Sequence, residues 1–275
     1  MGLNPKLFLQ IFLIVLIALN LMAYLNLVLR LELPPTINIF IGPSVVSLVI
    51  TIAIWFLVKH FTIRLKEVED EKHLALEHAQ RDFIYKMGEI GETRNCETGH
   101  HVKRVAEFSE LLAQLYGLEA TEVELLKNAS PMHDIGKVGI PDRILLKPDT
   151  LNHEEFEVMK THTTMGYEIL KDSKQSIIEA AAIIAYEHHE KWDGSGYPNG
   201  LKGEDIHIFG RITAIVDVLD ALSCKRVYKE AWKKASVIEY FEEERGKHFD
   251  PQLVELFLQN FEKFVLIQEG NRDED

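Results

Sequence analysis

The sequence predicts an all-α protein, made of a two-helix membrane hairpin, a connecting helix and a helical bundle in water. Two long uncharged runs lie near the amino terminus, and beyond them apolar residues recur every three or four positions with no convincing strand pattern. Charge divides the chain in the same place. The charged residues of 1–58 are Lys6, Arg30 and Glu32, which give this part a net charge of +1. Because the whole chain has a net charge of −13, residues 59–275 carry −14.

Both uncharged runs have the length of a transmembrane helix. Residues 7–29 and 37–58 contain 23 and 22 residues, and about 20 residues cross a hydrocarbon core. A cleaved signal peptide is the alternative for the first run, although signal peptides have a shorter apolar stretch. Pro34 and Pro35 suit a tight turn, so we expect a membrane anchor over 1–58. Basic residues such as Lys6 outside the hairpin predict an inner-membrane protein with both termini and the domain after the hairpin in the cytoplasm.

A helical linker is expected over residues 59–90. It is rich in Glu, Lys, Arg, Ala and Leu and contains no Gly or Pro before Gly88. Apolar residues recur along one face with spacings of three and four, which would allow pairing with a second copy of the chain as a homodimer. A solvated connector helix is the alternative. The stripe consists of Leu76, Ala79, Phe83, Met87 and Ile90.

A helical domain follows over residues 91–265, with an acidic tail over 266–275. Thr121 and Asn152 each precede a glutamate by three positions, which is the chemistry of a helix N-cap. Gly117 is expected to end the helix that precedes Thr121. Residues 176–190 and 205–223 are two further helices with wide apolar faces.

Histidines and carboxylates are scattered over five of these helical segments. Each is weak alone, because a His-Asp pair is typical of a surface turn and a lone helical histidine is more often packed or solvated. Together they are informative, since one bundle could turn them all inward. The candidates are Glu97, His101 with His100 as its alternative, His133, Asp134, His162, His188, His189 and Asp217.

The number of donors bears on the number of ions. Eight protein ligands overfill a single tetrahedral or octahedral ion, whereas two or three ions about 3.5 to 4 Å apart would use them. His188 and His189 diverge by about 100° on a helix, so each could address a different ion. Asp217 and Asp220 fall beside the apolar face of their helix, where a solvated edge is the alternative.

At this point the motifs resemble a known family. The set ETGxHxxR, HDIGK, HTTMG, HHEKWDGSGYP, DVLDALS and KHFDP is similar to the HD-GYP domain, the cyclic di-GMP phosphodiesterase branch of the HD superfamily. The resemblance covers residues 90–265 and favours His101 over His100. It implies two or three divalent ions, with Fe or Mn favoured and Zn permitted, and a third ion through Glu97. The implied ligands are Glu97, His101, His133, Asp134, His162, His188, His189 and Asp217.

The resemblance also implies the remaining site residues. Asp134 and Lys137 are the implied catalytic residues, and Lys137 with Arg226 and Lys229 would contact the substrate phosphates. Val227 stands where the family usually has proline. The loop containing Gly194 and Tyr197 would cover the substrate. The reaction implied is hydrolysis of cyclic di-GMP to pGpG, with GMP as a further product.

Three alternatives remain open. The substrate could be another cyclic dinucleotide, the protein could be a receptor that binds a cyclic dinucleotide without cleaving it, or the bundle could be structural. The last gives no reason to bury histidines and carboxylates. The acidic domain disfavours DNA or RNA as a partner, because gripping long nucleic acid requires a basic surface. The expected partners are therefore cyclic di-GMP and the membrane.

Overall fold

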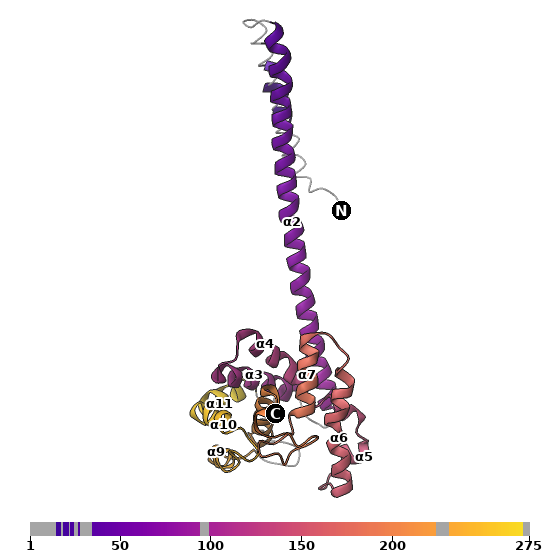
Figure 1. Cartoon of the computed structure of the whole chain (residues 1–275), viewed down its shortest axis with the longest axis vertical. Coiled ribbons are helices and arrows are strands. Elements are labelled where there is room, and N and C mark those ends of the chain that lie inside the picture. The colour runs from indigo at the N-terminus through magenta and orange to yellow at the C-terminus, as the bar shows by residue number, and fades with distance from the viewer. Residues whose placement is uncertain are drawn as a thin grey trace. The chain divides into compact units, whose positions relative to one another are not determined.

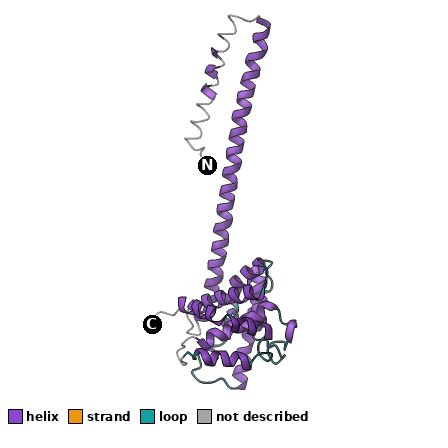
Figure 2. Ribbon diagram, turned by 90° about the vertical axis from the view of Figure 1, so that its left-hand side faces the viewer, coloured by secondary structure: helices purple, strands orange, loops and turns teal. Residues whose placement is uncertain are grey.

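The structure is a computed structural model that describes residues 15–17, 19–21, 23, 24, 27, 35–93, 99–223 and 231–271. In these residues every regular element is helical and no strand occurs (Figure 2). The all-α prediction is therefore confirmed for the part of the chain that is described. The chain divides into two compact units, residues 1–77 and 78–275.

The helices follow one another along the chain as labelled in Figure 1. Three of the elements are single 3-10 turns, and two of these, η1 and η2, flank His133 and Asp134. The elements are α2 (Pro35–Thr93), α3 (Gly99–Tyr116), α4 (Ala120–Ala129), η1 (Ser130–Met132), η2 (Ile135–Gly139), α5 (Asp142–Leu145), α6 (His153–Leu170), α7 (Ser176–Glu187), η3 (Gly203–Asp205), α8 (Ile208–Ser223), α9 (Lys234–Glu243), α10 (Pro251–Gln259) and α11 (Phe261–Gly270).

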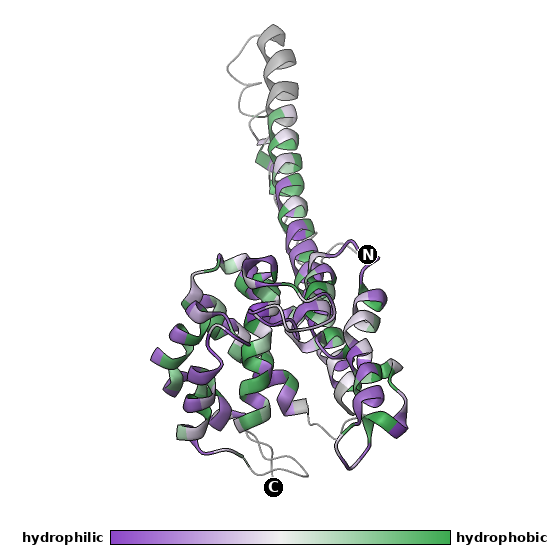
Figure 3. Cartoon of the chain, turned by 60° about the horizontal axis from the view of Figure 1, so that its bottom comes forward, coloured by the Kyte–Doolittle hydropathy of each residue, from purple (hydrophilic) through white to green (hydrophobic). Residues whose placement is uncertain are grey.

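Helix α2 joins the second apolar run to the predicted linker without a break. Its colour changes from hydrophobic to hydrophilic along its length (Figure 3). Among the described residues, Ser47–Gly91 is long and apolar enough to cross a membrane, with a mean hydropathy of 1.7 in its apolar window. Most of the first apolar run lies outside the described residues, so the hairpin stays a prediction.

The predicted helix ends are partly confirmed. Asn152 caps α6, since its side chain accepts a hydrogen bond from the Glu155 backbone N–H. Gly117 ends α3 with a positive φ of 91°, which glycine adopts without strain. The expected cap at Thr121 is wrong, because the N-cap of α4 is Glu119, two residues earlier, with Glu122 as the reciprocal partner.

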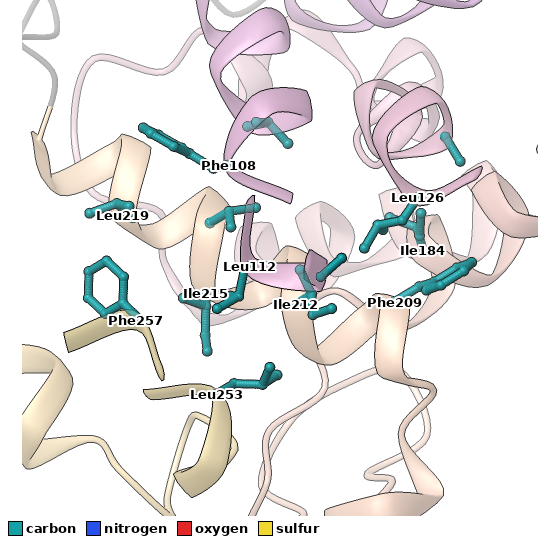
Figure 4. Close-up of a cluster of buried hydrophobic side chains, with 14 of the residues drawn as sticks. Phe108, Leu112, Leu126, Ile184, Phe209, Ile212, Ile215, Leu219, Leu253 and Phe257 are labelled. Atoms are coloured by element: carbon teal, nitrogen blue, oxygen red, sulfur yellow. The ribbon is translucent and has the colours of Figure 1, made fainter. Parts of the chain in front are cut away.

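One apolar core joins the helices of the second unit (Figure 4). Helix α3 packs against α4 and α8, and α7 packs against α6 and α8. Phe108 and Leu112 of α3 are buried with Ile215 of α8, and Leu253 and Phe257 of α10 complete the cluster. These side chains hold α3, α7 and α8 at fixed positions, and each of these helices carries candidate ligands.

Glycines allow three backbone contacts around the turn that holds His133 and Asp134. A Cβ on Gly88 of α2 would lie 2.4 Å from the Pro131 carbonyl oxygen, and one on Gly91 would lie 3.3 Å from that of Asp134. A Cβ on Gly136 of η2 would lie 1.9 Å from the His162 carbonyl oxygen. The turn is thus pressed between α2 and α6 with no side chain between the backbones.

We expect Gly136→Ala to destabilise the protein by about 1–3 kcal/mol, since the added methyl must displace backbone rather than a flexible side chain. Denaturant unfolding of the full chain measures the effect. Gly270→Ala is the control, because nothing lies within 4 Å of a Cβ at that position. Equal stabilities of the two variants would contradict the contact between η2 and α6.

Candidate metal centre

Five parts of the fold deliver the described candidate ligands. His101 lies in the first turn of α3, His162 in the middle of α6 and Asp217 in α8. His133 ends η1 and Asp134 begins η2, so both sit in the turn between them. His188 is the C-cap of α7, followed directly by His189. The candidate that lies outside the described residues is Glu97.

The first donor cluster consists of Asp134, His162, His188 and His189, whose ligand atoms all lie within 4.8 Å of one another. Nε2 of His162 is 3.2 Å from Oδ1 of Asp134, and Nε2 of His188 is 3.8 Å from the same oxygen. The ligand atoms of His188 and His189 lie in one cluster, and the expectation that each serves a different ion stays a prediction. Helix α7 ends at Glu187, and the 100° divergence of helical neighbours does not apply beyond its end.

The second donor cluster consists of His101, His133 and Asp217, also within 4.8 Å. Nε2 of His133 lies 3.7 Å from Oδ1 of Asp217 and 3.2 Å from Oδ2 of Asp134. Asp134 therefore faces the first cluster with one oxygen and the second cluster with the other. A carboxylate in this position can be shared by two ions.

Backbone carbonyls orient three of the histidines. Nδ1 of His133 lies 3.0 Å from the Ser130 carbonyl oxygen, and Nδ1 of His188 lies 3.0 Å from that of Ile184. Nδ1 of His162 likewise lies 2.8 Å from the Met159 carbonyl oxygen, in the preceding turn of α6. A carbonyl only accepts, so each Nδ1 donates and each neutral ring has its lone pair on Nε2. The Nε2 atoms are the ones that face the clusters.

Electrostatics keeps these donors in the forms that bind cations. Burial lowers the pKa of His188 and of His189 well below the usual histidine value, so both rings are neutral near pH 7. Burial opposes ionisation of Asp134, but the Lys137 ammonium beside Oδ2 is the main cause that outweighs it, and the pKa of Asp134 lies well below its usual range. Metal ligands must be neutral imidazoles and ionised carboxylates.

The donor set fits divalent cations. Oδ1 of Asp134 is buried and accepts no hydrogen bond. Nε2 of His162 lies 3.4 Å from Nε2 of His188, and with both protons on Nδ1 neither nitrogen can donate to the other. Lone pairs thus face one another in a buried space, which is costly unless a cation lies between them. Ligand atoms about 2 Å from an ion lie roughly 3 to 4 Å apart, as these do.

Lys137 brings a positive charge to the donor clusters. Its Nζ is 2.5 Å from Oδ2 of Asp134, and its side chain is 13% exposed. It follows Asp134 by three residues in η2, so the turn that supplies the carboxylate also supplies the ammonium. An ammonium here can bind a phosphate oxygen next to the donor clusters.

The loop after His189 borders the first cluster. The Tyr197 ring lies 4.9 Å from the His189 ring, centroid to centroid, and burial raises the pKa of Tyr197 far above its usual value, so its hydroxyl remains a donor. Gly194 has a positive φ of 86°. The Glu190 carboxylate accepts hydrogen bonds from the backbone N–H groups of Asn199 and Leu201 and so fixes the loop.

Two contributing residues were not predicted as site residues. Asp220 is 2% exposed, rather than on a solvated helix edge, and contacts His101. The sequence signal that could have identified Asp220 is its position three residues after Asp217, on the same side of the helix. Glu190 is also 2% exposed, and only its position inside the histidine motif could have indicated its role. The predicted phosphate ligands Arg226 and Lys229 lie outside the described residues.

Comparisons with known proteins match the chain to one family and to several relatives. A family model described as HD domain matches residues 66–253. The chain is 49% identical over 193 residues to 3'3'-cGAMP-specific phosphodiesterase 2 of Vibrio cholerae, covering 70% of the chain and 37% of that protein. It is 43% identical over 198 residues to a cyclic di-GMP phosphodiesterase of Thermotoga maritima, covering 70% and 54%. The chain thus spans about half or less of the length of these relatives.

A solved structure shares the fold. The crystal structure of a cyclic GMP-AMP-specific phosphodiesterase of Vibrio cholerae, V-cGAP3, superposes with a TM-score of 0.54 at 18% identity. The match covers 71% of this chain and 51% of that one. At this identity the likeness shows the fold alone.

We expect the metal-free protein to lose stability as the pH falls below about 6.5. The unfolded chain then protonates His188 and His189, whereas burial keeps them neutral in the folded state, so acidification favours unfolding. Each histidine contributes a slope of up to about 1.4 kcal/mol per pH unit. Urea unfolding between pH 7.5 and 5.5 measures it. A double variant, His188→Gln with His189→Gln, should show a smaller slope, and an equal slope would contradict the assignment.

Proposed function

The chain belongs to the HD domain family, and on that premise we propose that it is a metal-dependent phosphodiesterase that hydrolyses cyclic dinucleotides. The observation that carries the proposal is the buried Asp134 carboxylate between two clusters of lone-pair donors. A catalytically idle receptor would need no such cage. The resemblance of the motifs to the HD-GYP domain supports the same activity.

We assign the ligands by cluster. Asp134, His162, His188 and His189 would hold one ion, and His101, His133 and Asp217 would hold a second, with Asp134 shared. Glu97 would contribute to a third ion. Imidazole and carboxylate donors suit Fe, Mn or Zn, and we favour Fe or Mn because of the family resemblance.

The residues of the chain then have distinct tasks. Bound divalent ions supply Lewis acidity, which acidifies water and neutralises phosphoryl charge. Lys137 binds a phosphate oxygen or protonates the leaving 3′ oxygen, and its short contact with Asp134 supports a place beside the reacting bond. Arg226 and Lys229 hold the other phosphate. Gly194 and Tyr197 cover the substrate, and the Tyr197 hydroxyl can donate to it.

Cyclic di-GMP is the substrate that we propose, with pGpG as product and GMP after a second cleavage. A relative at 43% identity bears the name cyclic di-GMP phosphodiesterase. The mixed dinucleotide 3'3'-cGAMP is a second candidate, because a relative at 49% identity is named for it. The acidic domain argues against DNA or RNA in either case.

We also propose that the protein is anchored in the inner membrane by the hairpin over 1–58, with the linker over 59–90, the catalytic domain over 91–265 and both termini in the cytoplasm. The apolar segment within α2 supports the anchor. Leu76 and Phe83 are 59% and 64% exposed on the linker, which supports a homodimer through this face.

Replacing His133 and Asp134 together by alanine should reduce turnover by about 10³-fold or more, equivalent to roughly 4 kcal/mol of transition-state stabilisation. The assay uses the full chain, purified without oxygen, with cyclic di-GMP and 3'3'-cGAMP supplied separately and products separated by chromatography. His100→Ala is the matched control, since this exposed neighbour of His101 is not an assigned ligand. Turnover retained in the double variant would contradict the proposal, and wild-type binding without cleavage would indicate the receptor.

The membrane anchor predicts that the full chain sediments with membranes and is released by detergent but not by high salt or alkaline carbonate. The physical reason is that burial of an apolar helix in lipid does not depend on ionic contacts. Fractionation of cells that express the chain measures this. Release by salt alone would contradict the anchor.

A further inference from the structure

Asp220 is a buried carboxylate that is fully engaged by two residues of α3. Its Oδ2 is 2.7 Å from Nδ1 of His101. Its Oδ1 is 2.5 Å from Nε of Arg104, whose Nη2 donates to Oδ2 at 3.2 Å. Asp220 and Arg104 are each 2% exposed. The pair therefore joins α8 to α3 beside the second donor cluster.

His101 differs from the other oriented histidines. His133, His162 and His188 donate Nδ1–H to a carbonyl three or four residues earlier. His101 instead directs Nδ1 at a carboxylate on another helix, that of Asp220 in α8.

We propose that Asp220 is a positioning residue, which fixes the tautomer and ring direction of His101 for metal binding; this rests on the proposed function. An ionised carboxylate only accepts hydrogen bonds, so Nδ1 of His101 must carry the proton. The lone pair is then on Nε2, the buried ring nitrogen on the side of the ring opposite to Asp220. Removal of such an outer partner typically weakens metal affinity about 10- to 100-fold.

Arg104 keeps this carboxylate ionised and in place. Its guanidinium grips both oxygens of Asp220, and its Nη1 donates to the Asn271 carbonyl at 2.9 Å. Asn271 is itself 6% exposed and donates through Nδ2 to Glu107 at 2.8 Å. A buried charge needs both a counter-charge and filled hydrogen bonds, and this arrangement supplies both. The end of α11 thereby supports the orientation of His101.

The test is metal binding by Asp220→Asn in the full chain. An amide can donate to Nδ1 of His101, so the tautomer is no longer imposed. Titration with Mn²⁺ alone, followed by elemental analysis, should show about one ion per chain fewer than wild type, or one site weakened about 10- to 100-fold. Helix content, from circular dichroism, should be unchanged.

Asp250→Asn is the matched control. Asp250 is a buried aspartate that pairs with Arg211 at 2.8 Å and caps α10, but it contacts none of the histidines in the clusters. It should retain the wild-type number of ions despite losing a buried ion pair. If Asp220→Asn binds Mn²⁺ as Asp250→Asn does, the positioning role is overturned.

A second measurement needs no variant at Asp220 to fold. Long-range ¹H–¹⁵N spectra of the metal-free full chain, labelled at histidine, report the tautomer of each ring, and His101→Gln identifies the His101 signal. The Nδ1–H tautomer is expected, and an Nε2–H tautomer would overturn the proposal. A wild-type chain that shows this tautomer but binds no Mn²⁺ would instead contradict the proposed function.

Discussion

The arrangement of the site depends on one constraint: buried lone pairs that face one another require positive charge between them. Asp134 presents one oxygen to His162 and the other to His133, and the histidine protons are drawn away from this space by backbone carbonyls and by Asp220. Without cations the arrangement is repulsive, and Lys137 offsets only part of the charge. The helical bundle maintains a cluster of groups that would otherwise separate.

The family and the helical class could be predicted from the sequence because both depend on local patterns. Apolar spacing identifies helices wherever one face is buried, as in α8, and Asn152 with Glu155 forms the expected cap. The motif containing His133 and Asp134 is specific in composition and spacing. The family match over residues 66–253 agrees with the resemblance that these motifs indicated.

Other features depend on geometry that a single sequence does not contain. The cluster membership of His188 and His189 follows from α7 ending at Glu187, two residues before His189. The role of Asp220 depends on how α8 lies against α3, since from sequence alone it is equivalent to Asp217. The cap of α4 at Glu119 rather than Thr121 shows that start signals compete when several polar residues are adjacent. In each case tertiary packing decides between locally similar options.

The two glycines of α2 have a thermodynamic consequence. Gly88 and Gly91 bring this helix against the backbone of Pro131 and Asp134, with no room for a Cβ on Gly88. Rotation of α2 would replace Gly88 by a residue with a larger side chain at the contact with Pro131. That side chain would have to displace the turn that carries Asp134. A rotation of α2 that displaced this turn would therefore move Asp134 within the donor clusters. By reciprocity, a cation that held Asp134 in place would oppose that rotation by the same free energy with which the rotation would weaken cation binding.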